Sequence, residues 1–189
     1  MTSKQYGFLF DADRCVMCHE CELACKGTLG VELAVSLRKV IEIWHGEFPN
    51  VRRTFVSLSC LHCAEPPCEQ ACPSGAISKR PQDGIVAVDR GKCTGCQECF
   101  FACPHGVPQF GADGTMQKCD LCLERGVRPA CTTSCPAEAL FFGTMEELEA
   151  TAGRKEGKRL FGAHGPSMFF INRRGPTIPE SSLTLGKRN

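Results

Sequence analysis

Short runs in which apolar and polar residues alternate recur along the chain, separated by clusters of turn-forming residues. Alternation over a few residues is typical of half-buried β-strands. The Asp83-Gly84 pair between two of these runs is a strong signal for a hairpin turn. The pattern predicts short strands at Tyr6–Phe10, Lys39–Ile43, Arg53–Leu58, Ile77–Lys79, Ile85–Val88, Ala139–Phe142 and Ser167–Ile171.

One helix has a clear start signal. Thr144 is followed three residues later by Glu147, which is the form of a capping box. We therefore expect a short helix that continues through about Ala152. Residues 172–189 are polar and rich in Gly, Pro and Ser. We interpret them as a loose terminus, with an arm that wraps a partner subunit as the alternative.

Composition changes this picture, because 16 of the 189 residues are cysteines. They fall into four quartets, each of which begins C-x2-C and ends C-x3-C, so one small unit is repeated. Glycine and proline number 19 and 12, which predicts many turns and no long helices. The quartets are Cys15, Cys18, Cys21, Cys25; Cys60, Cys63, Cys68, Cys72; Cys93, Cys96, Cys99, Cys103; and Cys119, Cys122, Cys131, Cys135.

Charge and hydropathy exclude two classes of protein. The formal net charge of +1 provides no basic excess, so no nucleic-acid partner is expected. No secretory signal is visible, and no apolar run approaches the roughly 18–20 residues that cross a bilayer. We expect a cytoplasmic protein without direct membrane insertion, or one that reaches the periplasm or a membrane through a partner that carries the signal. Four cubane clusters on sixteen thiolates would shift the net charge to about −7.

The cysteine spacing favours iron–sulfur clusters over three other chemistries. A disulfide framework has no reason to repeat such tight quartets, and a structural zinc site needs two C-x2-C pairs further apart. The run Cys15-x-x-Cys18-His19 matches the c-type haem signature, but Cys21 and Cys25 continue the series through it. The first and third quartets read C-x2-C-x2-C-x3-C, the bacterial ferredoxin run.

The end of each quartet carries further information. In two-cluster ferredoxins the fourth cysteine leaves its loop and ligates the other cluster. Pro73, Pro104 and Pro136 directly follow the fourth cysteine of their quartets, and proline should end a short helix there. The first quartet departs from this pattern, because Lys26 follows Cys25.

Other polar residues lie close to the cysteines. We interpret His62 and His105 as turn residues that pack over a cluster, with tuning of its potential as the alternative. Lys26, Lys92 and Lys118 adjoin cysteines. Partial compensation of cluster charge and ordinary solvated positions both remain open for these lysines.

From Tyr6 to Gly143 the chain resembles the four-cluster iron–sulfur subunits of the dimethyl sulfoxide reductase family of molybdenum and tungsten enzymes. Relatives of these subunits occur in polysulfide, nitrate and formate enzymes. The combination is highly specific, whereas one quartet alone would indicate only a ferredoxin module. The resemblance is carried by Cys21-Glu22-Leu23-Ala24-Cys25-Lys26, Cys60-Leu61-His62-Cys63-Ala64-Glu65-Pro66-Pro67-Cys68, Ala102-Cys103-Pro104-His105-Gly106 and Lys118-Cys119-Asp120-Leu121-Cys122.

The resemblance implies a nested pairing of quartets, first with fourth and second with third. Some relatives replace the second cysteine of the third quartet and hold a three-iron cluster there. Cys96 occupies this position here, so four [4Fe–4S] clusters are expected. The implied ligand sets are Cys15, Cys18, Cys21, Cys135 for cluster 1; Cys119, Cys122, Cys131, Cys25 for cluster 2; Cys60, Cys63, Cys68, Cys103 for cluster 3; and Cys93, Cys96, Cys99, Cys72 for cluster 4.

The implied fold is α+β, with tandem bacterial-ferredoxin-like modules in two pseudo-twofold pairs and little regular structure. Residues 1–143 would form the four-cluster domain, and residues 144–189 a short helix, a strand and the tail. We expect no C-terminal transmembrane anchor, which many relatives have.

The implied function is electron transfer, with no catalytic residue on this chain. The partners would be a molybdenum- or tungsten-pterin catalytic subunit and a quinone module or soluble acceptor, with a membrane anchor or a flavin subunit as further candidates. Three alternatives are a wiring subunit of a tungsten aldehyde oxidoreductase or hydrogenase-type complex, a free-standing polyferredoxin and a zinc-binding structural module.

Overall fold

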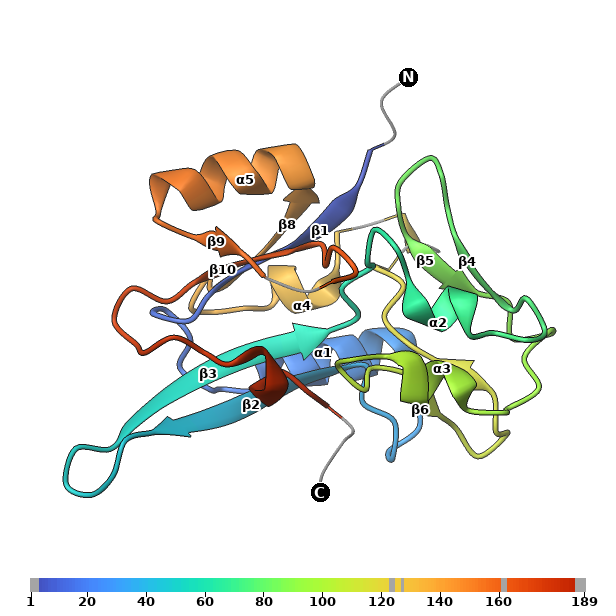
Figure 1. The fold of residues 1–189 in the computed structure, drawn as a ribbon, viewed down its shortest axis with the longest axis horizontal. Helices are drawn as coiled ribbons and strands as arrows, with labels where there is room; N and C mark the ends of the chain where they lie inside the picture. The colour runs from blue at the N-terminus through green and yellow to red at the C-terminus, as the bar shows by residue number, and fades with distance from the viewer. Residues whose placement is uncertain (1–3, 123–124, 127, 161–162, 186–189) are drawn as a thin grey trace.

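Segments from the two ends of the chain form one four-stranded sheet in the computed structural model, which describes residues 4–122, 125–126, 128–160 and 163–185 (Figure 1). The strand order is β8-β1-β10-β9. Strand β1 pairs antiparallel with β8 and parallel with β10. The sheet therefore crosses residue 143, where the two predicted domains would divide. Its strands are β1 (Tyr6–Asp11), β8 (Leu140–Thr144), β9 (Lys158–Arg159) and β10 (Met168–Ile171).

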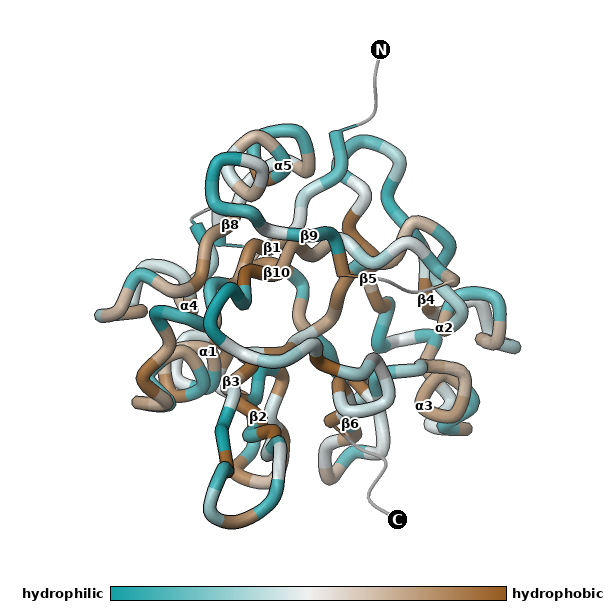
Figure 2. The backbone as a smooth tube through the Cα atoms, turned by 60° about the vertical axis from the view of Figure 1, so that its left-hand side comes forward, coloured by the Kyte–Doolittle hydropathy of each residue, from teal (hydrophilic) through white to brown (hydrophobic). Residues whose placement is uncertain are grey.

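The alternation of side chains along β1 supplies two cores. Phe8 and Phe10 point to the main core, while Leu9 points to the opposite face. Helix α5 (Met145–Arg154) covers that opposite face with Leu148 and Ala152. Figure 2 shows the hydrophobic segments of β1 and β10 at the centre of the molecule. Burial of each large apolar side chain stabilises the fold by about 1.5–3 kcal/mol.

The predicted capping box at the start of α5 is confirmed. The Thr144 hydroxyl accepts from the Glu147 N–H at 3.3 Å, and the Glu147 carboxylate accepts from the Thr144 N–H at 2.8 Å. These two bonds satisfy N–H groups that a helix start leaves without a partner.

Three antiparallel hairpins complete the strands. The longest, β2–β3, projects from the body at the lower left of Figure 1. All seven predicted strands are present with bounds shifted by at most two residues, and the hairpin turn at Gly84 has the positive φ of 69° that glycine permits. The two-residue strands were not predicted. The hairpins are β2 (Arg38–His45) with β3 (Arg52–Ser59), β4 (Ile77–Lys79) with β5 (Val86–Val88), and β6 (Gln109–Phe110) with β7 (Met116–Gln117).

A short helix lies within each quartet. Three of these helices stop before the Cys-Pro pair that ends the quartet. The helix of the first quartet continues past Cys25, because Lys26 stands where the others have proline, and it ends at the left-handed Gly30. The first helix contacts the fourth, and the second contacts the third. They are α1 (Glu20–Leu29), α2 (Pro67–Gln70), α3 (Glu98–Ala102) and α4 (Ala130–Thr133).

The C-terminal segment packs against the body, so its interpretation as a loose terminus is wrong for residues 172–185. Leu183 is only 2% exposed. Its carbonyl accepts from His105 Nδ1 at 2.6 Å, and the Leu185 N–H donates to the His105 carbonyl at 2.8 Å. A single-turn 3-10 helix, η2 (Glu180–Ser182), lies just before these contacts. Residues 186–189 lie outside the described part of the chain.

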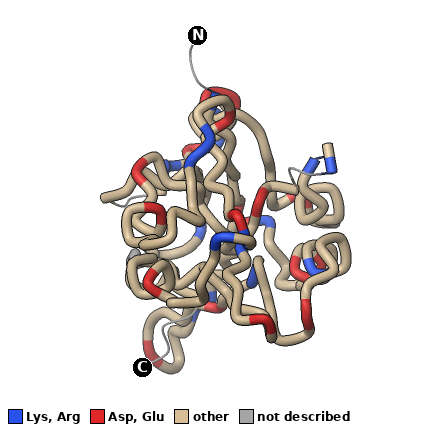
Figure 3. The backbone as a smooth tube through the Cα atoms, turned by 90° about the vertical axis from the view of Figure 1, so that its right-hand side faces the viewer, with Lys and Arg blue, Asp and Glu red and all other residues tan. Residues whose placement is uncertain are grey.

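Charged residues of both signs are interspersed over the side of the molecule shown in Figure 3. This distribution agrees with a formal charge close to zero. Within the described ranges, no helix has the length and apolar character needed to cross a bilayer.

Candidate iron–sulfur sites

The backbone curls in the same way at the C-x2-C pair that opens each quartet. The residue before the second cysteine always has a left-handed φ between 43° and 72°. A left-handed conformation costs a non-glycine residue about 1–2 kcal/mol, so the surrounding structure must hold it there. Such turns direct successive N–H groups into one concave space, which suits an anionic cluster. The four residues are Met17, His62, Gly95 and Leu121.

A second left-handed position follows the Cys-Pro pairs. It lies three residues after the fourth cysteine, at Gly75, Gly106 and Glu138. The chain turns back at this point and brings backbone N–H groups toward the cysteine sulfur. The N–H of Ala139, for example, donates to Cys135 Sγ at 3.3 Å.

The fold brings together the thiols that the nested pairing predicts for two of the sites. One cavity is lined by Cys15, Cys18 and Cys21 of the first quartet and by Cys135 of the fourth; we call it site 1. A second cavity is lined by Cys93, Cys96 and Cys99 of the third quartet and by Cys72 of the second; we call it site 4. In both cavities the four thiols line the wall, which is a suitable donor set for an iron–sulfur cluster.

The remaining thiols lie in two further groups, within which the sulfurs are close enough to shift one another's pKa. Burial raises the pKa of Cys25 to about 12, and the sulfurs of Cys131 and Cys122 add to the shift. Burial and then Cys131 and Cys25 raise the pKa of Cys119. The set that the nested pairing predicts here, which we call site 2, is Cys119, Cys122, Cys131 and Cys25.

The last group is arranged likewise. Burial raises the pKa of Cys68 to about 12, and the sulfurs of Cys60, Cys103 and Cys63 contribute in the same direction. Site 3 is therefore Cys60, Cys63, Cys68 and Cys103. None of the sixteen cysteines, all of which lie in the described ranges, forms a disulfide.

Burial raises the pKa of most of these thiols and makes them harder to ionise. It raises the pKa of Cys63 to about 12 and that of Cys99 to about 11. Only the thiolate ligates a metal, so assembly of a cluster must release these protons. Cys72 is different. Burial opposes its ionisation, but hydrogen bonds from the Ser74 hydroxyl and nearby N–H groups hold its pKa below the ordinary value.

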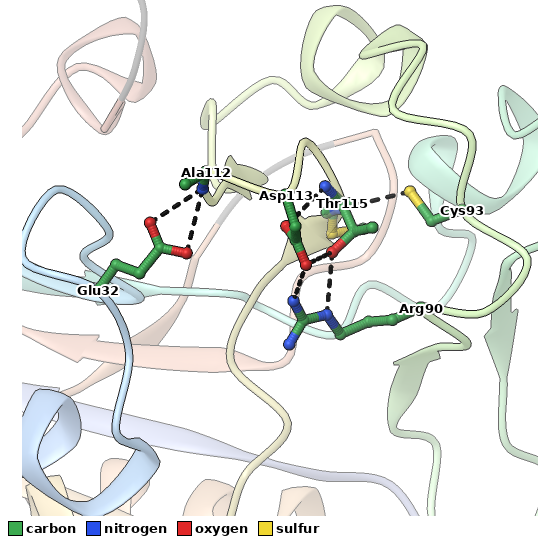
Figure 4. Close-up of polar contacts among 7 residues, drawn as sticks. Glu32, Arg90, Cys93, Ala112, Asp113 and Thr115 are labelled. Atoms are coloured by element: carbon green, nitrogen blue, oxygen red, sulfur yellow. Dashed lines mark hydrogen bonds and ion pairs between the residues drawn. The ribbon is translucent and has the colours of Figure 1, made fainter.

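The β6–β7 hairpin forms one wall of site 4. The Met116 N–H donates to Cys93 Sγ at 3.3 Å (Figure 4). Arg90 holds the hairpin turn, because its guanidinium donates to Thr115 Oγ1 and pairs with Asp113. The carboxylate of Glu32, which lies between α1 and β2, accepts from the Ala112 N–H at 2.9 and 3.1 Å. This contact joins the α1 segment to the hairpin beside site 4.

Two cations lie beside site 3, one buried and one half-buried. Lys118 is 7% exposed and donates to the carbonyls of Val86 and Cys119, so a solvated position is wrong for this residue. The Lys79 ammonium donates to the Cys63 carbonyl at 2.9 Å. Lys118 favours the thiolate of Cys68. Lys92, by contrast, is exposed and lies 3.6 Å from Asp89.

The two histidines have structural roles in turns. His62 is 1% exposed and its Nδ1 accepts from the Val86 N–H at 3.0 Å. Burial, together with Lys118 and Lys79, holds the pKa of His62 well below its ordinary value. His105 anchors the C-terminal segment, as described above.

Two sites reach the molecular surface. Cys18 of site 1 and Cys96 of site 4 are exposed, and the other fourteen cysteines are buried or half-buried. Sites 1 and 4 therefore each have one ligand at the surface, whereas sites 2 and 3 have none that is fully exposed.

Sequence reasoning missed two cations beside the thiols, the buried Arg38 and the half-buried Lys79. Lys79 lies in a short strand, and Arg38 begins β2, so neither adjoins a cysteine in the sequence. The available signal for Arg38 was the alternation of Ser57 and Ser59 with the apolar Val56 and Leu58, which places two hydroxyls on one face of the strand.

Comparison with known proteins identifies similar chains. Residues 51–145 match the 4Fe-4S dicluster domain family. The chain is 44% identical to the probable anaerobic dimethyl sulfoxide reductase chain YnfG of Escherichia coli K12, over 79% of this chain and 78% of that protein. It is 37% identical to a sulfite dehydrogenase subunit of Allochromatium vinosum, over 77% of this chain and 71% of that one. The hydrogenase-2 operon protein HybA of Escherichia coli O157:H7 is 33% identical, over 79% of this chain and 55% of its own length.

Proposed function

Because the chain belongs to the family of [4Fe–4S] electron-transfer subunits found in dimethyl sulfoxide reductase, we propose that it holds four such clusters. It would relay electrons between a molybdenum- or tungsten-pterin catalytic subunit and a quinone module or soluble redox partner. The chain itself is an electron-transfer subunit and not the catalytic one.

One observation carries the proposal. In sites 1 and 4, three thiols of one quartet line a cavity together with the fourth thiol of its nested partner, and the helices pair in the same order, α1 with α4 and α2 with α3. A ferredoxin pair exchanges its fourth cysteines in this manner. The arrangement supports two ferredoxin-like pairs within residues 1–143, although the sheet also includes β10.

The protein residues would hold the clusters and adjust their surroundings. Sites 1 to 4 would each supply four thiolates, and the clusters would supply reversible one-electron transfer. The N–H groups of Met116 and Ala139 donate to ligand sulfurs and stabilise negative charge there. Apolar packing around Cys119 and Cys131, both buried, excludes water from site 2.

The two exposed ligands indicate where redox partners would contact the protein. Site 1 would face one redox partner through Cys18, and site 4 would face another through Cys96. The compartment we propose is the cytoplasm, or the periplasm or a membrane surface if a partner carries the signal. A membrane anchor or flavin subunit would be the second partner.

Iron and acid-labile sulfide analysis of anaerobically purified protein tests the proposal. We expect about sixteen irons and as many sulfides per chain. Cys96→Ser should remove or convert the site 4 cluster, whereas Thr94→Ser in the same cavity should retain all four. Full iron content in Cys96→Ser, or far fewer irons in the unchanged protein, would contradict the assignment.

Purification under native conditions separates the proposed function from the free-standing polyferredoxin. Stable copurification with a large pterin-containing subunit is expected. Recovery of the chain alone, loaded with clusters, would favour the shuttle. Copurification with a hydrogenase subunit would favour the hydrogenase-type alternative, to which the similarity to HybA draws attention.

A further inference from the structure

Arg38 is a charged residue in the interior of the molecule. It is 2% exposed, and it begins β2 at the base of the projecting hairpin. The register pairs Arg38 with Ser59 on β3. Ser57 lies two residues away on the same face of that strand, so both hydroxyls are directed toward the arginine.

Neutral groups hold the guanidinium in place. Its Nη1 donates to Ser57 Oγ at 3.0 Å and to the Ser57 carbonyl at 3.3 Å, and its Nη2 donates to Ser59 Oγ at 2.8 Å. The Phe8 ring lies 4.4 Å from the guanidinium carbon in a cation–π contact. These contacts fix the position of the charge but do not neutralise it.

No carboxylate pairs with Arg38 within the part of the chain that the structure describes. Its Nε–H is also buried without a hydrogen-bond partner. A buried charge without a counter-ion is strongly unfavourable, so a fold retains one only where an opposite charge lies nearby.

Cysteine sulfurs of two sites would supply the opposite charge as thiolate ligands of a cluster. Burial acts against the charged form of Arg38, but the sulfurs of Cys131, Cys119, Cys21 and Cys25, when ionised, raise the pKa of the arginine above its ordinary value. Cys21 belongs to site 1, and the other three belong to site 2. The hydroxyl of Ser57 also lies 3.3 Å from Cys21 Sγ and so bridges the guanidinium to site 1.

We propose that Arg38 is a fixed positive charge shared by sites 1 and 2, and that it raises the reduction potential of both. This inference rests on the proposed function, because it requires clusters at these sites. One residue outside the cysteine quartets would then influence the reduction potentials of two of the four sites.

The sign follows from charge. A [4Fe–4S] cluster with four thiolates is anionic, and reduction adds one more negative charge. A positive charge held nearby favours the reduced form, and the low local dielectric of the interior strengthens the effect. Loss of the charge should therefore lower the potentials of the two sites.

Redox titration of the holoprotein, followed by electron paramagnetic resonance, tests the inference with Arg38→Met and Arg38→Lys. We expect two of the four reduction steps in Arg38→Met to become about tenfold less favourable, which is about 59 mV for one electron. Arg38→Lys keeps the charge and should stay close to the unchanged protein. Unchanged potentials in Arg38→Met, with full iron content, would overturn the inference.

Lys118→Met is the matched control, since it removes another buried cation. Lys118 acts on Cys68 of site 3, so the potential of site 1 should not change in this variant. If clusters assemble in Arg38→Lys but not in Arg38→Met, the result supports a requirement for positive charge at this position. If clusters assemble in neither variant, the result contradicts that requirement, because the shape of the arginine side chain would then be what matters. Low iron content in the unchanged protein would instead contradict the proposed function.

Discussion

Left-handed backbone recurs directly before the second cysteine of every quartet, yet four different residue types occupy this position. Glycine adopts this conformation freely, as Gly95 does, while Met17 and Leu121 adopt it at a cost. Burial around each site supplies the compensation, since Leu121 is 3% exposed. The preference of glycine for left-handed backbone therefore identifies only one of these four positions from the sequence, Gly95.

Gly95→Ala should destabilise the protein and site 4 in particular. The new Cβ would lie 2.8 Å from the Gly114 carbonyl oxygen, and φ is +72°. We expect a loss of about 2 kcal/mol from the left-handed conformation and the backbone clash together. The measurement is the guanidinium concentration at which cluster absorbance is lost under anaerobic conditions.

Gly27→Ala is the control for this change. Gly27 lies inside α1, and a Cβ there meets nothing within 4 Å. Alanine should raise helix stability by about 0.5–1 kcal/mol. Equal effects of the two substitutions would contradict the argument from backbone conformation.

Helix ends show how local signals operate at the scale of the element. The capping box starts α5 where the sequence predicts it, because all of its bonds lie within four residues. The Cys-Pro pairs end α2, α3 and α4 for an equally local reason. The position of α5 over the sheet depends instead on Leu148 and Ala152, which pack against β1 and β10.

Thr144→Ala should destabilise α5 by about 1 kcal/mol, because it removes the hydroxyl that accepts from the Glu147 N–H. Hydrogen exchange of amides in the first turn reports the loss. Thr151→Ala, in the interior of the same helix, is the matched control and should be neutral or slightly stabilising. A larger effect at position 151 would argue against the cap.

Contacts between residues far apart in the sequence join the C-terminal segment to the turn that follows β1. Asp13 accepts hydrogen bonds from the N–H groups of Arg173 and Arg174 and from the Arg173 side chain. Burial alone would raise the pKa of Asp13, but these bonds and the nearby guanidinium hold it below its ordinary value. The depressed pKa means that the contact is stabilising above the unfolded pKa and is lost as the pH falls through the folded value.

Asp13→Asn should release this contact at neutral pH. The amide lacks the negative charge, and charge-assisted hydrogen bonds contribute about 1.5–3 kcal/mol. We expect trypsin to cleave after Arg173 or Arg174 about tenfold faster or more. Asp89→Asn is the control, because Asp89 is exposed and far from these bonds in the sequence. Unchanged cleavage in Asp13→Asn would show that other contacts hold the segment.

Features that depend on near neighbours were predictable from the sequence. The cysteine quartets indicated iron–sulfur chemistry, and the alternating runs and the capping box located the strands and α5, because each signal lies within a few residues. Tertiary packing established that β10 pairs with β1 and that residues 172–185 pack on the body. It also placed Arg38 beside sulfurs of the first and fourth quartets. Burial and charge depend on segments that meet only after folding, and no local pattern encodes such a meeting.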